Sequence, residues 1–335
     1  MRRPADERMT LDASGTEAHH ASYAIRVRSL HKRFGAVVAV ENVTLDVPRG
    51  SVFGLLGPNG SGKTTLMAML LGLLEPSSGE IELLGHSSVR ALAAARARVG
   101  SAIEAPAFYP FLSARQNLRV FQSLLGRSDM GEIEQVLELV GLASASARRF
   151  DTYSMGMKQR LAFARAMLGQ PELILLDEPT NGLDPMGVCE VREIVRRLVA
   201  QGTTILLSSH QLGEIEQLCS EVAIMEQGRL VQPVFALHEL RRPTRYSVRT
   251  TDQVAAARLL QHLLSERPSH NANDGGQALH VTLPEARLPE ISQTLATENV
   301  YLVELAKSPV SLEEVYLEAL RTARAREFGS ATHAA

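Results

Sequence analysis

A short glycine-rich segment constrains this chain more than any other feature of its sequence. It follows a continuous apolar run at residues 52–57 and precedes an apolar helical run, and it fits the pattern G-x-x-x-x-G-K-[ST]. Glycines let successive backbone N–H groups turn inward around phosphate oxygens, and the N-terminus of the following helix adds positive charge. We therefore predict a nucleotide-binding loop that comprises Gly57, Pro58, Asn59, Gly60, Ser61, Gly62, Lys63, Thr64 and Thr65.

Two residues near the end of this loop carry the expected chemistry. Lys63 is predicted to reach the β- and γ-phosphates of ATP, and Thr64 to ligate Mg²⁺. Four of the 35 basic residues are lysines, so a lysine at this position argues against a chance match. ATP and Mg²⁺ are therefore the expected cofactors.

Three continuous apolar runs predict the fold class. They cover residues 52–57, 173–178 and 204–210. Strands without polar alternation are buried on both faces, which is typical of parallel sheets in α/β proteins. The active groups of such sheets lie at the carboxyl ends of the strands, so chemistry is expected where these runs end.

The second apolar run ends in two carboxylates that suit a hydrolytic site. Asp177 is predicted to belong to the Mg²⁺ site, and Glu178 to accept a proton from an attacking water. The alternative interpretation is a strand that ends in two solvated acids. The presence of the phosphate loop argues against this alternative. The sequence contains no Asn-Lys-x-Asp, so guanine recognition of the small-GTPase kind is not supported.

The sequence pattern divides the chain into three parts. Residues 1–22 form a polar N-terminal tail that is expected to be disordered. Residues 23–240 form the predicted ATPase domain, with a helical subdomain at about 102–168. Residues 241–335 alternate strand and helix patterns and predict a small α+β domain, in which residues 267–277 indicate a loop.

Composition and charge argue against several classes of protein. The chain is 45% hydrophobic and 21% charged, as ordinary globular proteins are. Its net charge of −2 argues against a general nucleic-acid binder, and no nucleic-acid partner is expected. No apolar run reaches the roughly 18 residues of a membrane span, and the N-terminus lacks the apolar core of a secretory signal. Contact with a membrane is therefore expected to come through a partner.

A further segment, YSMGMKQRLAFARAML at residues 153–168, completes an ordered set of motifs. It follows the phosphate loop and precedes LILLDEPTNGLDP and a lone histidine in LLSSH. In this order the segments resemble the ABC transporter ATPases over residues 23–232, with residues 153–168 similar to that family's signature. The resemblance implies the P-loop NTPase fold of an ABC ATPase domain with an inserted helical subdomain. It also implies ATP hydrolysis at sites shared between two subunits of a homodimer or heterodimer.

The resemblance gives roles to residues at two predicted helix starts. Ser154 and Gly156 of the signature would close over ATP held by the phosphate loop of the opposed subunit. Ser154 is also explained as an ordinary helix N-cap, and it can fill both roles. Asp184, which precedes Pro185, would likewise cross the dimer interface, but a capping role explains it equally well.

Two further residues match positions that the family uses to contact nucleotide. His210 matches the switch histidine that contacts the γ-phosphate, and Phe34 matches the aromatic residue that stacks on adenine. A lone histidine is more often structural, and Phe34 could instead belong to the core. The resemblance favours the nucleotide role for both.

The sequence departs from the family at Glu104 and at two methionines of the signature. Glu104 stands where the family usually has glutamine; a carboxylate accepts hydrogen bonds but, unlike an amide, donates none. We expect Glu104 to keep its catalytic and metal-binding place and to alter the positioning of water. The same glutamate occurs in the similar bacitracin- and lantibiotic-type transporters. Met155 and Met157 stand where glycine and a polar residue are commoner, and the bulk of Met155 is expected to loosen the closed dimer.

An aromatic cluster follows Glu104. Phe108, Tyr109 and Phe111 fall within four positions. They either pack inside the helical subdomain or line a groove that receives a short helix from the membrane partner, because aromatic anchors favour such pockets.

These predictions combine into one hypothesis of function. The chain is predicted to be the ATP-binding and ATP-hydrolysing subunit of an ABC transporter that powers a separate transmembrane permease for export of a drug or peptide antibiotic. It would be cytoplasmic and peripheral on the inner face of the cell membrane. A soluble ABC ATPase of ribosomes or DNA would carry two motor domains or a coiled-coil insertion, and a non-hydrolysing module would lack Glu178. The C-terminal domain is expected to regulate or stabilise the dimer.

Overall fold

The protein consists of two compact units. The computed structural model describes residues 22–103, 108–240, 245–263, 269–270, 278–308 and 310–331. The first unit spans Met1–Phe235 and the second spans Ala236–Ala335. Residues 1–21 of the tail predicted at residues 1–22 lie outside the described residues, as does Glu104.

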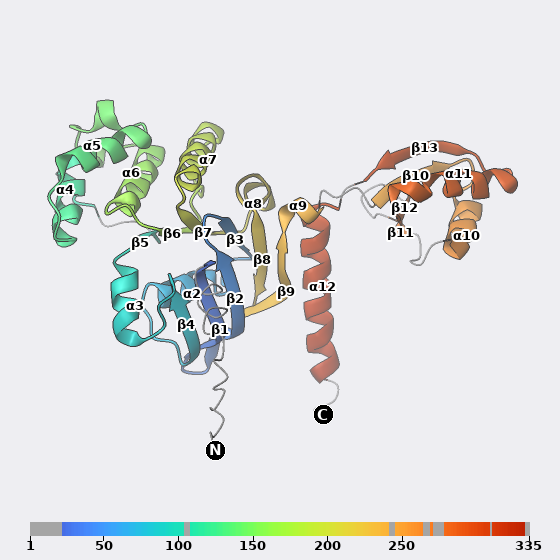
Figure 1. Cartoon of the computed structure of the whole chain (residues 1–335), viewed down its shortest axis with the longest axis horizontal. Coiled ribbons are helices and arrows are strands. Elements are labelled where there is room, and N and C mark those ends of the chain that lie inside the picture. The colour runs from blue at the N-terminus through green and yellow to red at the C-terminus, as the bar shows by residue number, and fades with distance from the viewer. Residues whose placement is uncertain are drawn as a thin grey trace, which may run out of the picture. The chain divides into compact units, whose positions relative to one another are not determined.

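A six-stranded sheet forms the centre of the first unit (Figure 1). The pairs β5–β6, β6–β7, β7–β3 and β3–β8 are all parallel. The predicted parallel α/β sheet is thus confirmed, and β3 and β7 are buried along their whole length. In sheet order the strands are β5 (Val99–Ala102), β6 (Leu173–Asp177), β7 (Thr204–Ser209), β3 (Val52–Leu56), β8 (Glu221–Glu226) and β9 (Arg229–Ala236).

A second sheet of the first unit is antiparallel. Its order is β2 (Val37–Pro48), β1 (Tyr23–Phe34) and β4 (Ser78–Leu83). Helix α2 (Lys63–Leu70), which follows the phosphate loop, contributes Leu66, Met67, Met69 and Leu70 to a core shared by both sheets. Burial of these side chains anchors α2 against the two sheets, because each contributes about 1.5–3 kcal/mol on burial. Helix α3 (Val89–Arg96) precedes β5.

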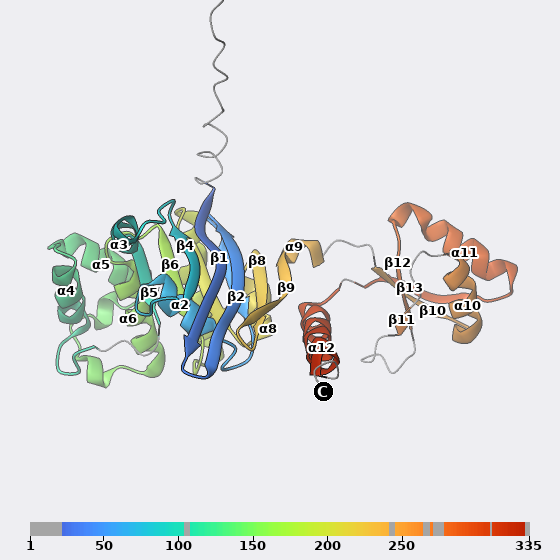
Figure 2. The same ribbon diagram turned by 90° about the horizontal axis from the view of Figure 1, so that it is seen from below.

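Three helices gather at one end of the large sheet, beyond β5 and β6 (Figures 1 and 2). They are α4 (Ala114–Leu124), α5 (Met130–Leu139) and α6 (Met155–Met167). Each begins where a side-chain oxygen accepts a backbone N–H hydrogen bond: Ser113 for α4, Asp129 for α5 and Ser154 for α6. The 3₁₀ turns η1 (Ala143–Ala145) and η2 (Phe150–Thr152) join α5 to α6.

Two helices flank the strand that carries the predicted histidine. Helix α7 (Pro185–Ala200) connects β6 to β7, and helix α8 (Leu212–Leu218) connects β7 to β8. Asp184 caps α7, and Pro185 occupies its first position. The chain thus passes from the acidic strand to the histidine strand through one parallel crossover.

The second unit contains an antiparallel sheet in the order β11-β12-β10-β13. Its strands are β11 (Ser269–His270), β12 (Leu279–Thr282), β10 (Arg245–Thr250) and β13 (Leu302–Lys307). Helices α10 (Gln253–Leu263) and α11 (Leu288–Thr297) pack with it around a core that includes Tyr246 and Leu260. Strand β11 lies within residues 267–277, where the sequence predicted only a loop, because its pairing with β12 depends on tertiary context.

The remaining helices of the second unit are α9 (Leu237–Leu240), the 3₁₀ turn η4 (Glu285–Arg287) and α12 (Leu312–Ala331). Within the described ranges, no helix combines the length and apolar character that a bilayer span requires.

Candidate nucleotide-binding site

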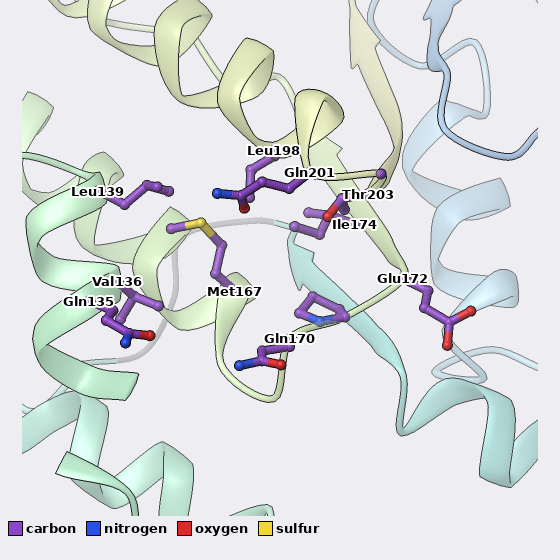
Figure 3. A pocket seen from close by; sticks show the side chains of 12 residues that line it. Gln135, Val136, Leu139, Met167, Gln170, Glu172, Ile174, Leu198, Gln201 and Thr203 are labelled. Atoms are coloured by element: carbon purple, nitrogen blue, oxygen red, sulfur yellow. The ribbon is translucent and has the colours of Figure 1, made fainter. Parts of the chain in front are cut away.

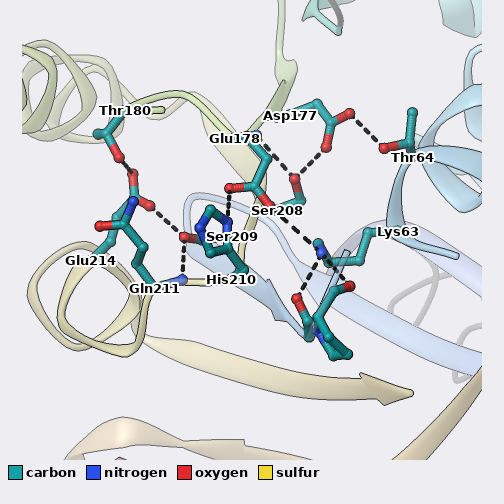
Figure 4. A network of polar contacts seen from close by, with 12 residues as sticks. Lys63, Thr64, Asp177, Glu178, Thr180, Ser208, Ser209, His210, Gln211 and Glu214 are labelled. Carbon is teal, nitrogen blue, oxygen red and sulfur yellow. Dashed lines mark hydrogen bonds and ion pairs between the residues drawn. The ribbon is translucent and has the colours of Figure 1, made fainter. Parts of the chain in front are cut away.

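The predicted phosphate loop joins β3 to α2 and surrounds the Lys63 side chain. Lys63 is only 5% exposed. Its Nζ donates hydrogen bonds to Gly57 O at 2.7 Å and to Pro58 O at 3.0 Å, and lies 3.6 Å from Glu178 Oε1 (Figure 4). The Ser61 hydroxyl is buried and has no hydrogen-bond partner in the described part of the chain. A buried cation and an unpaired hydroxyl in one loop fit an anion such as phosphate.

Two glycines of the loop have no room for a side chain. A Cβ on Gly57 would lie 2.1 Å from Met225 O, and one on Gly62 would lie 2.4 Å from Ala39 O. Gly62 also has a φ of 104°, a conformation that residues with a side chain rarely adopt. The loop is therefore pressed against the backbone of β8 and β2, which fixes its shape.

This close packing gives a first prediction. Gly57→Ala should lower the free energy of unfolding by about 1–3 kcal/mol, because the added methyl group must displace a backbone carbonyl, and it should weaken ATP binding. Thermal unfolding and a fluorescent-ATP titration measure the two effects. Gly213→Ala is the matched control, since a Cβ at Gly213 meets no atom within 4 Å. Parental stability of Gly57→Ala would show that the loop is not held in this way.

The side chains expected to hold Mg²⁺ meet at the end of β6. The Thr64 hydroxyl donates to Asp177 Oδ2 at 2.7 Å, and the Ser208 hydroxyl donates to Asp177 Oδ1. Hydroxyl and carboxylate oxygens are the ligands that Mg²⁺ takes together with water and substrate phosphates. Among the residues described, no cluster of three or more His, Cys, Asp or Glu side chains could hold a metal alone. The Thr64 hydroxyl and the Asp177 carboxylate fit a Mg²⁺ ion that takes its other oxygens from nucleotide phosphates and water.

Glu178 and His210 contact each other directly. Glu178 Oε2 lies 2.8 Å from His210 Nδ1 (Figure 4). The other oxygen, Oε1, is buried and accepts no hydrogen bond within the described ranges. Glu178 has a φ of 47°, and its N–H donates to Ser208 Oγ at 3.0 Å. Two residues that are 32 positions apart in the chain thus form one polar pair beside Lys63.

Sequence reasoning missed the polar residues that support this pair. Glu214 accepts hydrogen bonds from the hydroxyls of Thr180 and Ser209. The Ser208 hydroxyl donates to the Asp177 carboxylate and accepts the N–H of Glu178. Burial raises the pKa of the Glu214 carboxyl group, and its two hydroxyl donors oppose that rise. The two serines that end the buried strand β7, Ser208 and Ser209, were the sequence signal that could have indicated this polar network.

The signature residues lie in a separate pocket of about 380 Å³. Ser154 Oγ accepts the N–H of Met157 at 3.3 Å, and Asp184 Oδ1 accepts the N–H of Gly187 at 2.8 Å. The capping role of both residues is therefore present. The pocket is lined by Ser154, Met155, Gly156, Arg160, Gly182, Leu183, Asp184, Met186, Gly187 and Glu190. No residue of the phosphate loop lines it.

Phe34 ends β1 and is 45% exposed, so it is not a core residue. It pairs with Val37 across the β1–β2 hairpin, and Lys32 Nζ lies 5.0 Å from the centre of its ring. Two residues after Val37, the carbonyl of Ala39 abuts Gly62 of the phosphate loop. The exposed ring thus lies on the hairpin whose second strand, β2, packs against the phosphate loop.

The aromatic cluster divides into a buried and an exposed part. Phe108 is buried and packs on Phe121, at 5.5 Å between ring centres, and on Phe150, at 4.9 Å. Tyr109 and Phe111 are exposed. Internal packing is therefore confirmed for Phe108, while the other two rings are open to a partner. Glu104 lies outside the described residues.

A pocket of about 420 Å³ opens among α5, the end of α6 and the end of α7 (Figure 3). It includes Gln135, Met167, Leu198 and Thr203. None of the predicted site residues that the structure describes lines it, so it is not included in the candidate site.

Comparison with known proteins identifies the family. A family profile described as ABC transporter matches residues 40–181. The chain is 35% identical over 299 residues to the bacitracin transport ATP-binding protein BcrA of Bacillus licheniformis, covering 89% of this chain and 97% of that protein. It is 40% identical over 208 residues to the lantibiotic transport ATP-binding protein SrtF of Streptococcus pyogenes, covering 62% and 89% respectively. A solved ATP-binding subunit of an ABC transporter is 31% identical, with a TM-score of 0.59 over 65% of this chain and 92% of that one.

The match to the Bacillus relative extends over nearly the whole length of both chains. The resemblance inferred from the motifs and the predicted fold class are both confirmed. The chain therefore belongs to the ATP-binding subunits of ABC transporters, which bind and hydrolyse ATP.

Proposed function

We propose that two subunits close around two ATP molecules and that hydrolysis reopens them. One observation carries this proposal. The phosphate loop, Asp177, Glu178 and His210 lie together, whereas Ser154, Gly156 and Asp184 line a different pocket. One chain then supplies half of each site, and a second copy or a sister chain supplies the other half.

The chemistry of each half-site follows from its residues. Lys63 would bind the β- and γ-phosphates, and Thr64 and Asp177 would hold Mg²⁺, which neutralises charge on the phosphates. Glu178 Oε1, a buried acceptor with no hydrogen-bond partner in the described part of the chain, would take a proton from the attacking water. His210, held by Glu178 Oε2, would contact the γ-phosphate. Phe34 would stack on adenine, and Glu104 would complete the metal site.

The remaining half-site would close from the opposed subunit. Ser154 and the free N–H groups at the start of α6 would face the γ-phosphate, because helix N-termini attract anions. Asp184 would cross the interface nearby. Met155 is 65% exposed in the same pocket, so its side chain would stand in the closing interface and weaken it.

We propose that this motor drives a separate membrane permease from the inner face of the cell membrane. Tyr109 and Phe111, which follow Glu104 in the sequence, are exposed and would receive a short helix of the permease. Similarity to bacitracin and lantibiotic transport subunits supports export of a peptide antibiotic or drug. The second unit would regulate or stabilise the dimer.

The substrate class can be tested in the organism that encodes the chain. Disruption of the gene should increase susceptibility to bacitracin or to a lantibiotic, measured as the minimal inhibitory concentration. The intact gene should restore resistance, and a Lys63→Ala gene should not, because transport needs bound ATP. Unchanged susceptibility to both classes would contradict the proposed substrate and leave the ATPase chemistry untouched.

A further inference from the structure

Glu214 is a buried carboxylate that bridges the two loops of the candidate catalytic pair. It lies in the first turn of α8 and is 4% exposed. The Thr180 hydroxyl donates to its Oε1 at 2.5 Å, and the Ser209 hydroxyl donates to its Oε2 (Figure 4). Thr180 follows Glu178 by two residues, and Ser209 immediately precedes His210.

The direction of these hydrogen bonds is set by the neighbouring backbone. Ser209 Oγ accepts the N–H of Gln211 at 3.0 Å, which leaves its proton for Glu214. Thr180 and Ser209 are both buried, so neither hydroxyl has water as an easy substitute. Hydrogen bonds to a carboxylate are shorter and stronger than those between neutral groups. Removing the carboxylate would therefore leave two buried donors unpaired.

The segment that Glu214 holds is strained. Glu178 has a φ of 47°, and a non-glycine residue keeps such a conformation only where the surroundings fix it. On one side of the turn, the Glu178 N–H donates to Ser208 Oγ. On the other side, Pro179 O accepts a hydrogen bond from Gln159 Nε2 at 3.0 Å, and Thr180 donates to Glu214. Two of these anchors reach the histidine strand: Ser208 lies within β7, and Glu214 reaches its last residue, Ser209.

We propose that Glu214 is a positioning residue for ATP hydrolysis, which holds Glu178 and His210 at contact distance by bridging Thr180 and Ser209. The proposal rests on the catalytic roles proposed for Glu178 and His210. Those two side chains lie 2.8 Å apart at the ends of β6 and β7. Ser208 fixes the backbone N–H of Glu178, and Glu214 fixes Thr180 and Ser209 close to the two side chains. Loss of the second connection could displace the pair by an ångström, which can cost about 100-fold in rate.

Glu214→Ala should lower kcat for ATP hydrolysis by about 10- to 100-fold. The Kd for ATP should stay near the parental value, because the phosphate loop does not contact Glu214. Glu214→Gln should recover much of the rate, since an amide of the same shape can accept from one hydroxyl and donate to the other. Glu216→Ala, an exposed glutamate on the same helix, is the matched control and should keep the parental kcat.

Two outcomes would overturn the proposal. One is a parental kcat for Glu214→Ala while Glu178→Gln is inactive. That result would rule out a positioning role for Glu214 and keep Glu178 as the general base. The other is an equal loss of ATP affinity and kcat with no rescue by Glu214→Gln, as expected of a residue that only stabilises the fold. A Glu178→Gln chain with the parental rate would instead contradict the proposed function itself.

Single-hydroxyl variants keep the proposal testable if Glu214→Ala fails to fold. Thr180→Val and Ser209→Ala each remove one half of the bridge and should each lower kcat at unchanged ATP affinity. Their combined effect should be clearly smaller than the product of the single effects, because both act through one carboxylate. If the double variant lost kcat by the full product of the two single losses, or if both single variants kept the parental kcat, the two hydroxyls would not act through one carboxylate.

Discussion

Glu178→Gln should reduce ATP hydrolysis by about 10²- to 10⁴-fold, the range that general-base catalysis contributes. Glutamine keeps the size of the side chain but cannot accept the proton of the attacking water. ATP should bind at least as tightly as in the parent, because one negative charge beside Lys63 is removed, 3.6 Å from its Nζ. Phosphate release and a fluorescent-ATP titration measure the two quantities. The variant should therefore accumulate in the ATP-bound state.

A matched control separates loss of the base from loss of any carboxylate. Glu193→Gln changes an exposed glutamate of α7 that pairs with Arg197 one helical turn away. Surface pairs of this kind contribute less than about 1 kcal/mol to stability, so its hydrolysis rate should be parental. Hydrolysis by Glu178→Gln at the same rate as Glu193→Gln would mean that another group, or water alone, accepts the proton.

Gly156→Asp should lower the rate of ATP hydrolysis by about 100-fold or more, while the variant chain still binds ATP at its own phosphate loop. A Cβ at Gly156 would meet no atom closer than Leu183 Cδ2 at 3.9 Å, so the side chain fits. An aspartate in the first turn of α6 is favourable for the helix itself. In the closed dimer, however, it would face the γ-phosphate, and two like charges about 4 Å apart near a surface repel by about 4 kcal/mol. ATP binding and hydrolysis should therefore separate.

Gly156→Asn controls for the bulk of the new side chain. It has the same shape as aspartate without the charge, so it should lose less activity than Gly156→Asp. Equal losses for the two variants would assign the effect to bulk. Parental hydrolysis by Gly156→Asp would show that this helix start does not face a phosphate.

Local motifs and one topological rule predicted which side chains meet beside the glycine-rich loop. The strand at residues 173–178 was predicted to bring its terminal carboxylates to the same sheet edge as the phosphate loop, and Lys63 and Glu178 lie 3.6 Å apart. The roles assigned to these residues remain predictions. Glu214 could not be identified in this way, because it meets Thr180 across 34 positions of sequence. That contact depends on how α8 packs, which no local pattern encodes.

The fold shows the same division between local and long-range information. Helix starts at Ser154 and Asp184 were predictable because capping needs only a side-chain oxygen and the next few residues. The end of α12 was not predictable from the sequence pattern, because the apolar pattern stops near residue 320 whereas the helix continues to Ala331. Alanine, arginine and glutamate beyond that point favour helix without contributing an apolar stripe. The short strand β11 depends on its pairing with β12 and left no signal of its own.

The central claim is that each hydrolytic site is built from two chains, and mixing two inactive variants tests it directly. Lys63→Ala lacks the phosphate-binding cation but keeps Gly156, whereas Gly156→Asp keeps Lys63. A mixed dimer contains one intact site, so equimolar mixing of differently tagged chains should give hydrolysis that neither variant shows alone. Failure of the tagged chains to co-purify in ATP, or a rate in co-purified mixed dimers no higher than the average of the separate rates, would contradict the claim.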